Sequence, residues 1–338
     1  MVATLKDVAA HAGVSFKTVS NVVNGYQYVT DETRERVLSS VAVLGYRPNL
    51  PARHLRKGRV GILALTIPDL ANPYFSDIAT AVSVAAAVHD YTILIDYTGG
   101  SRANESLVAN GVRPHLIDGV ILNPLVLGMD DLQPDRAGAP IVLLGERLFG
   151  APWDHVAIDN VAAARLATAH LLSLGRRRLA FIGAQDDSEP NAASLRLRGF
   201  TEALAAEGLS PDPQLIVGVP FNAFRRAEGA QAMRLLLALP HPPDAIFCYN
   251  DLLALGALHV LRQAGCRIPD QVAIAGFDDI EEGHFAAPSL TTISPDKAEI
   301  GRLAVTLLLD RVAGARTGRP ERLQPSFRLV VRESTSVR

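Results

Sequence analysis

The 338-residue sequence contains little cysteine and no long apolar segment. Two cysteines, Cys248 and Cys266, are too few for a disulfide framework, so both are expected to be reduced, packed thiols. No apolar run reaches the length of a membrane span, and the N-terminus begins with an amphipathic pattern instead of a signal peptide. These absences predict a cytoplasmic protein with no membrane partner.

The motifs of nucleotide and metal chemistry are also missing. The sequence has neither a G-x-x-x-x-G-K-[ST] loop nor a G-x-G-x-x-G turn after a predicted strand, so phosphate groups lack their usual cradle. The nine histidines are scattered, and no paired cysteines accompany them. No nucleophile, acid and base stand together as a catalytic group. The sequence therefore predicts no cofactor, no metal and no catalytic residue.

The charge is unevenly distributed along the chain. Residues 1–58 carry three Lys and five Arg against four acids, a net charge of +4, although the whole chain has a net charge of −2. Basic segments attract the phosphate backbone of nucleic acids. The first 58 residues are therefore the predicted DNA-contacting part.

Residues 4–24 predict two short helices joined by a tight turn. The apolar residues of the first helix recur at the spacing of one helical face: Leu5, Val8, Ala9 and Ala12. Those of the second helix are all valines: Val19, Val22 and Val23. Gly13 suits the left-handed backbone that the turn requires, and Ser15 can cap the second helix. The pattern is that of a helix-turn-helix.

A third helix is predicted after Thr30, with acidic residues in its first turn. Its apolar positions complete a small core: Val37, Val41 and Leu44. The opposite face of the second helix then points outward, where a recognition helix presents its first residues to base edges. That face holds Phe16, Lys17, Ser20 and Asn21. Any small helical hairpin can show such an apolar stripe, but the glycine turn, the capping serine and the valine face together favour DNA binding.

This combination resembles the helix-turn-helix of the LacI/GalR family of bacterial transcription regulators. The resemblance implies DNA contacts by a set of residues in the helical domain: Thr4, Ser15, Phe16, Lys17, Thr18, Ser20, Asn21, Asn24 and Thr33. The basic, proline-interrupted segment that follows resembles the family's hinge, which becomes helical on operator DNA and wedges a leucine into the minor groove. The matching hinge residues are Asn49, Ala52, Arg53 and Leu55. The family most often has arginine at the position of Asn21, so the base read there is expected to differ.

From Val60 onward, short apolar runs alternate with helical patterns, which predicts doubly wound parallel sheets in an α/β fold. Buried strands are predicted at 61–67, 92–95, 119–122, 141–144, 156–158, 179–182, 216–219, 245–248 and 272–275. Helices are predicted at 74–89, 160–174, 195–207, 227–239 and 252–265. So many strands favour two lobes over one sheet.

The family resemblance covers this part as well and implies a two-lobed, periplasmic-binding-protein-like core whose lobes exchange strands near residues 290 and 322. The predicted domains are an all-α helix-turn-helix domain and a hinge, followed by the two lobes of the core. Their bounds are 1–47, 48–58, 59–160 plus 291–322 for the N-terminal lobe, and 161–290 plus 323–338 for the C-terminal lobe.

Polar side chains follow several predicted strands, at the edge where open α/β sheets bind small molecules. Arg196, Asn250 and Asp278 offer a guanidinium, an amide and a carboxylate, each of which can bind adjacent hydroxyls of a sugar. The alternative for an acid after a strand is a helix cap. The resemblance implies effector contacts by Asn72, Phe75, Asn123, Asp159, Arg196, Phe224, Asn250 and Asp278.

The sequence thus predicts a ligand-responsive, sequence-specific DNA-binding regulator, most simply a repressor of a pseudo-palindromic operator controlled by a sugar or sugar derivative. A solute-binding transport receptor would share the core. It would, however, need an export signal and would not carry residues 1–58. A carbohydrate-related enzyme would need a catalytic group. The segment after Arg332 lacks the leucine-heptad helix that joins some family members into tetramers, so a homodimer is expected.

Overall fold

The computed structural model describes residues 3–23, 26, 28–46, 58–111, 116–133, 138–185, 191–220 and 223–336. It consists of two compact units, Met1–Gly61 and Ile62–Arg338. None of the helices within these described ranges is long and apolar enough to cross a membrane.

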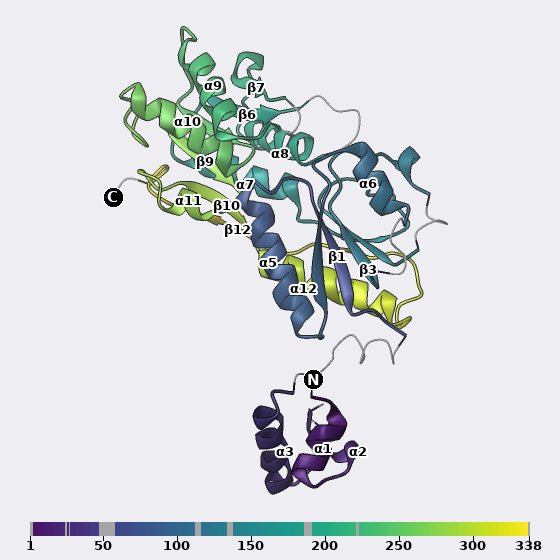
Figure 1. Cartoon of the computed structure of the whole chain (residues 1–338). Helices are drawn as coiled ribbons and strands as arrows, with labels where there is room; N and C mark the ends of the chain where they lie inside the picture. The colour runs from purple at the N-terminus through teal and green to yellow at the C-terminus, as the bar shows by residue number, and fades with distance from the viewer. Residues whose placement is uncertain are drawn as a thin grey trace. The chain divides into compact units, whose positions relative to one another are not determined.

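The first unit is a bundle of three helices (Figure 1): α1 (Leu5–Ala12), α2 (Phe16–Val23) and α3 (Asp31–Val43). A capping box begins α1, because the Asp7 carboxylate accepts the Thr4 backbone N–H at 2.8 Å and the Thr4 hydroxyl accepts the Asp7 N–H at 3.4 Å. The helix ends at Gly13, whose φ of +64° is the left-handed turn predicted from the sequence. Ser15 Oγ then accepts the Thr18 N–H at 3.1 Å and begins α2.

The bundle encloses a small apolar core. Its buried members are Val8, Ala9, Ala12, Val19, Val22 and Val37. Leu5, Val23, Val41 and Leu44 pack against them, so every apolar position predicted to face inward does so. His11 Nδ1 lies 3.0 Å from Ser40 Oγ and links α1 to α3. The predicted helix-turn-helix with a third supporting helix is confirmed.

The second unit begins with a sheet of six parallel strands, in the order β11-β5-β4-β3-β1-β2. The strands are β1 (Ile62–Ile67), β2 (Thr92–Tyr97), β3 (Gly119–Leu122), β4 (Ile141–Leu144), β5 (Asp154–Val156) and β11 (Arg322–Leu323). The helices of this first lobe are α5 (Pro73–Ala87), α6 (Arg102–Ala109), α12 (Lys297–Val312) and the 3-10 turn η1 (Met129–Asp131).

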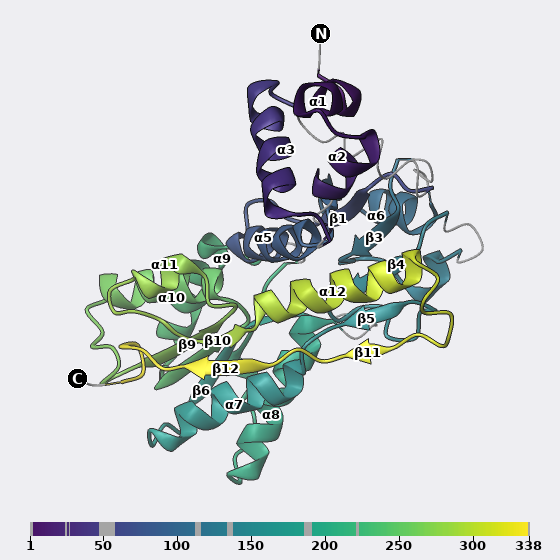
Figure 2. The ribbon, with the colours of Figure 1, turned by 90° about the horizontal axis from the view of Figure 1, so that it is seen from below.

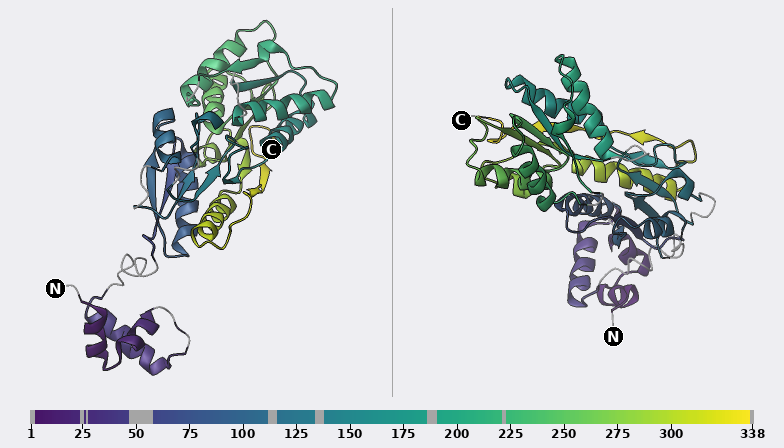
Figure 3. Two further views of the ribbon diagram at one scale, coloured as in Figure 1. Left: turned by 90° about the vertical axis from the view of Figure 1, so that its right-hand side faces the viewer. Right: turned by 90° about the horizontal axis from the view of Figure 1, so that it is seen from above.

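A second sheet has the order β12-β10-β9-β8-β6-β7, with only β12 antiparallel to its neighbour. Its strands are β6 (Leu179–Ala184), β7 (Ile216–Gly218), β8 (Ala245–Cys248), β9 (Ala273–Phe277), β10 (Thr291–Pro295) and β12 (Phe327–Val330). The helices of this second lobe are α7 (Asn160–Ser173), α8 (Ala192–Ala206), α9 (Arg226–Leu237), α10 (Asp251–Gln263), α11 (Glu281–His284) and the 3-10 turn η3 (Pro213–Leu215). The views of Figure 3 show helices on both faces of the sheets, so the predicted doubly wound α/β architecture is confirmed.

The chain crosses between the lobes after β5, β10 and β11. Figure 2 shows α12 lying along the first lobe and the final segment passing from β11 to β12. The predicted bounds 291–322 for the returning segment need correction, because β10 pairs with β9 in the second sheet and β11 extends to Leu323 in the first. The crossings therefore follow Pro295 and Leu323. The strand predicted at 156–158 also lies two residues earlier, as β5.

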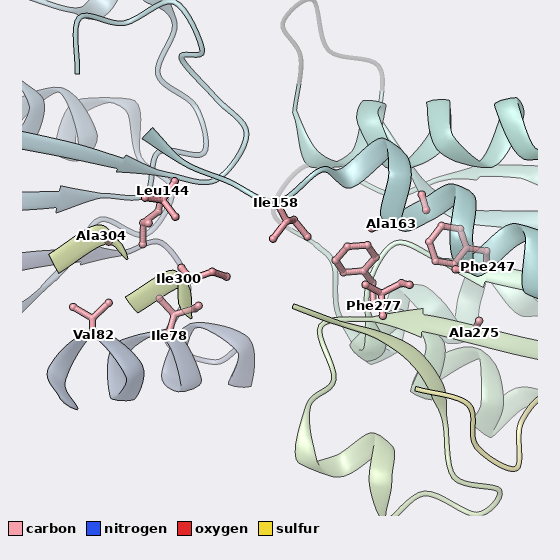
Figure 4. Packing of buried hydrophobic residues seen from close by; sticks show 14 of the residues in the cluster. Ile78, Val82, Leu144, Ile158, Ala163, Phe247, Ala275, Phe277, Ile300 and Ala304 are labelled. Carbon is pink, nitrogen blue, oxygen red and sulfur yellow. The ribbon is translucent and has the colours of Figure 1, made fainter. Parts of the chain in front are cut away.

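One apolar cluster runs through both lobes. In Figure 4, Ile158 lies between a first-lobe group that includes Leu144 and Ile300 and a second-lobe group that includes Phe247 and Phe277. Ile158 belongs to the link between β5 and α7, so the connection itself is part of the core.

Candidate functional site

The outward face of α2 has the composition predicted for it. Phe16 is 45% exposed and Lys17 is also exposed, whereas Val19 and Val22 on the other side are buried. Ser20 and Asn21 share the outer face and are half-buried. The helix therefore presents an aromatic ring, a cation and two small polar groups to its surroundings.

Four of the hydroxyl groups predicted to contact DNA, those of Thr4, Ser15, Thr18 and Thr33, make local hydrogen bonds. Thr4 donates its O–H to Asp7 at 2.7 Å, so its role in the structure is a helix cap. Ser15 and Thr18 bond to each other at 2.9 Å, and Thr30 donates to Thr33 at the same distance. These bonds fix the side chains at the starts of the helices. Some predicted contacts lie outside the described residues: Asn24, Asn49, Ala52, Arg53 and Leu55.

The second unit contains a cavity of about 180 Å³ at the carboxyl ends of strands from both lobes. The segments after β1, β3 and β4 form one wall, and those after β6, β8 and β9 form the other. We call it the interlobe cavity. It is lined by most of the predicted effector residues: Asn72, Phe75, Asn123, Arg196, Phe224, Asn250 and Asp278. Asp159 does not line it; this carboxylate is exposed and caps α7 by accepting the Ala162 N–H at 2.9 Å.

Arg196 is held rigidly in the wall of this cavity. Its Nε donates to Asn160 Oδ1 at 2.7 Å and its Nη1 donates to the Tyr249 carbonyl at 2.6 Å. The guanidinium also lies over the Phe277 ring, 3.4 Å from the centroid. Gly199 explains why α8 reaches this position: a Cβ there would lie 2.2 Å from the Val161 carbonyl oxygen, so only glycine lets α8 approach α7 so closely.

Asp278 is a buried carboxylate on strained backbone. Its φ is +107°, a value that non-glycine residues rarely adopt and that is often found at ligand sites. Burial raises its pKa to about 6 although the charge of Arg196 lowers it. The Arg196 Nη1 atom is 3.8 Å from Asp278 Oδ1, too far for a hydrogen bond.

Asn250 contributes more to the architecture than to the cavity surface. Its Oδ1 accepts the Leu253 N–H at 2.9 Å and its Nδ2 donates to the Phe224 carbonyl at 3.2 Å, so it both caps α10 and holds Phe224. The Phe224 ring stacks on Tyr249 with centroids 4.1 Å apart. This pair forms an aromatic wall.

Several lining residues were not singled out in the sequence: Tyr74, Glu146, Gln185 and Tyr249. Burial raises the pKa of Tyr249 to about 12, so this phenol stays neutral. Glu146 and Gln185 follow β4 and β6, so the strand-end rule alone would have marked them. Glu146 Oε1 accepts a hydrogen bond from Asn160 at 2.6 Å, which connects a first-lobe acid through Asn160 to Arg196.

A buried glutamate supports the first-lobe wall from behind. The Glu105 carboxylate accepts the backbone N–H groups of three successive residues after β3, at distances of 2.9 to 3.1 Å. Those residues are Leu125, Val126 and Leu127. Burial raises the pKa of Glu105, and these bonds partly oppose that effect. The loop that carries Asn123 and Leu125 into the cavity is therefore fixed by one side chain of α6. In the described ranges, no group of three or more His, Cys, Asp or Glu is arranged to hold a metal ion.

Comparison with known proteins gives consistent results for both units. Residues 4–49 match the family model described as bacterial regulatory proteins, lacI family, and residues 168–335 match that of a periplasmic binding protein-like domain. The chain is 35% identical to the transcriptional repressor CytR of Escherichia coli K12, over 98% of this chain and 96% of that protein.

Two solved structures share the whole architecture. The regulator CelR in complex with cellobiose is 35% identical, with a TM-score of 0.72 over 98% of this chain and 99% of that one. The lac repressor dimer bound to operator and an anti-inducer is 27% identical, with a TM-score of 0.76 over the full length of both chains.

Proposed function

Because this chain belongs to the LacI family of bacterial regulatory proteins, we propose that it is a transcriptional repressor whose binding to a pseudo-palindromic operator responds to a sugar or sugar derivative. The observation that carries the proposal is the combination of two sites in one chain. A helix-turn-helix with an exposed α2 face lies in residues 1–61, and a cavity lined by both lobes lies in residues 62–338. We place its action in the cytoplasm, where operator DNA lies.

We assign DNA contact to the outer face of α2, with Phe16 and Lys17 reading bases and Ser20 and Asn21 beside them. Residues 48–58 are assigned as the hinge, with Leu55 as the minor-groove wedge. The lobes are assigned as 59–159 plus 296–323 and 160–295 plus 324–338, following the observed crossings.

The interlobe cavity is assigned as the effector site and not as a catalytic site, since the matched relative CytR and the similar structures are regulators. A ligand held there contacts both lobes and stabilises one relative orientation, which shifts the population toward it. Coupling of this kind is typically about 1–3 kcal/mol, enough to change operator occupancy several-fold or more.

A homodimer is supported by exposed apolar side chains on the first lobe. They lie on α5, at its C-cap and on the edge strand β2: Val84, Val88, Leu94, Ile95 and Tyr97. Exposed apolar edges are typical of interaction surfaces. A two-fold symmetric dimer also matches a pseudo-palindromic operator.

In vitro selection from random DNA duplexes with the full-length protein tests the function. We expect enrichment of a pseudo-palindromic site and a change in affinity for that site when the effector is added. Lys17→Ala should alter the selected site, and Lys6→Ala on α1 is its matched control, because each variant removes one exposed lysine of the helical domain. Failure to enrich any common sequence would refute the proposal.

A further inference from the structure

The cationic side chains lining the interlobe cavity are already engaged. Arg225 Nη2 lies 3.1 and 3.2 Å from the two carboxylate oxygens of Asp69. Arg147 is buried, and its charge lowers the pKa of the buried Glu105 that it lies near. Arg196 donates to Asn160 and to the Tyr249 carbonyl. Among the described lining residues, each of the three arginines thus has a partner within the protein.

Two carboxylates in the same wall are less well compensated. Glu146 accepts hydrogen bonds only from neutral groups, the Asn160 amide at 2.6 Å and its own backbone N–H, within the part of the chain that the structure describes. Asp278 is 5% exposed, its ion pair with Arg196 is long, at 3.8 Å, and the charge of Lys297 lowers its pKa without outweighing burial. Burial raises the pKa of both groups. Acids that are withdrawn from solvent are normally satisfied by donors, so the buried Asp278 and the half-buried Glu146 both favour a ligand that supplies O–H groups.

A neutral donor completes the pattern. The Gln185 Nε2 atom is buried and has no hydrogen-bond partner among the described residues, yet the side chain lines the cavity. A buried amide N–H without an acceptor is uncommon in folded proteins. A ligand oxygen would satisfy it. The cavity therefore offers carboxylates that need donors and an amide that needs an acceptor, a set that hydroxyl groups can serve in both directions.

We propose that the interlobe cavity binds an uncharged polyhydroxylated ligand and rejects the phosphorylated or carboxylated form of the same compound. This inference rests on the proposed effector site and adds its charge selectivity. Hydroxyls donate to Glu146 and Asp278, and a ligand oxygen accepts from Gln185. A phosphate or carboxylate instead places a negative charge beside the buried Asp278 and the half-buried Glu146, while the lining arginines remain engaged with their own partners.

Matched pairs of compounds test this selectivity on the full-length protein. The pairs are glucose and glucose 6-phosphate, ribose and ribose 5-phosphate, cellobiose and cellobionate, and adenosine and adenosine monophosphate. Thermal shift identifies the binding pair, and calorimetry at pH 7.5 measures both members. We expect the neutral member to bind at least about tenfold more tightly. Tighter binding of the anionic member would overturn the charge selectivity and leave the effector site standing. If no compound raised the melting temperature, both the charge selectivity and the effector site would be overturned.

Two variants connect the selectivity to named groups. Glu146→Gln removes one acid from the cavity wall. The ratio of the affinity for the neutral compound to the affinity for its anionic partner should therefore fall several-fold. Gln185→Leu should lower the affinity for the neutral ligand, because the ligand oxygen loses the amide donor of Gln185. Glu207→Gln, at a 52% exposed position at the end of α8, is the matched control and should change neither value. An unchanged ratio in Glu146→Gln would overturn the proposal.

Discussion

Replacing the buried Asp278 by asparagine is expected to make the protein more stable at neutral pH. The pKa of this carboxyl is about 6 in the folded protein, against an ordinary value of 3.8. Each pKa unit corresponds to about 1.4 kcal/mol, so ionising Asp278 in the folded state costs about 3 kcal/mol. Asparagine has nearly the same shape and carries no such penalty. Arg196 keeps its bonds to Asn160 and Tyr249 in the variant.

The sign of the pH dependence follows from linkage. Because the folded state binds the Asp278 proton more tightly than the unfolded chain, the stabilisation is fully present below about pH 3.8 and is lost as the pH rises through about 6. Wild type should therefore lose stability relative to Asp278→Asn by about 2 kcal/mol between pH 4.5 and pH 7.5.

Urea unfolding at these two pH values measures the effect, followed by circular dichroism and by the fluorescence of Trp153, the only tryptophan. Asp270→Asn is the matched control, because this aspartate of the second lobe has a 55% exposed side chain. A variant that is less stable than wild type at pH 7.5, or a difference that does not change with pH, would refute the reasoning. We also expect the variant to lose its effector response, because the carboxylate proposed above to accept a ligand hydroxyl is then absent.

The elements that could be predicted are those whose local pattern agrees with their burial. β3, β4 and β8 match their predicted bounds because each is a short, fully buried apolar run. α6 escaped prediction because its buried positions are Glu105 and Ala109, which form no apolar stripe. β11 is a two-residue strand with no apolar run, so only the sheet pairing reveals it.

The residues of the candidate site likewise divide into those that the sequence could predict and those that it could not. The strand-end rule placed Arg196 and Asp278 in one cavity although they are far apart in the sequence. Asp159, which the family resemblance implied as an effector contact, caps α7 instead and does not line the cavity. Glu146 and Gln185 also follow strands, β4 and β6, but the rule was not applied to these two strand ends, so both residues were missed.

Three further variants test the helical domain, the packing of the second lobe and the cavity wall. Lys17→Ala should change which operator variants are preferred, at about 1–3 kcal/mol for a lost base contact, whereas an equal loss on all operators would make Lys17 a phosphate contact. Gly199→Ala should lower the free energy of unfolding by about 1–3 kcal/mol or more, because the new Cβ would lie 2.2 Å from the Val161 carbonyl oxygen; an unchanged urea midpoint would contradict this. Glu105→Gln should weaken effector binding while operator binding without effector persists. The amide keeps one acceptor oxygen but turns an NH₂ group toward backbone N–H groups of Leu125–Leu127, so the loop after β3 loses its anchor and the cavity wall its fixed position. Calorimetry with the neutral ligand measures this loss, and wild-type affinity in Glu105→Gln would show that the wall keeps its shape without the carboxylate.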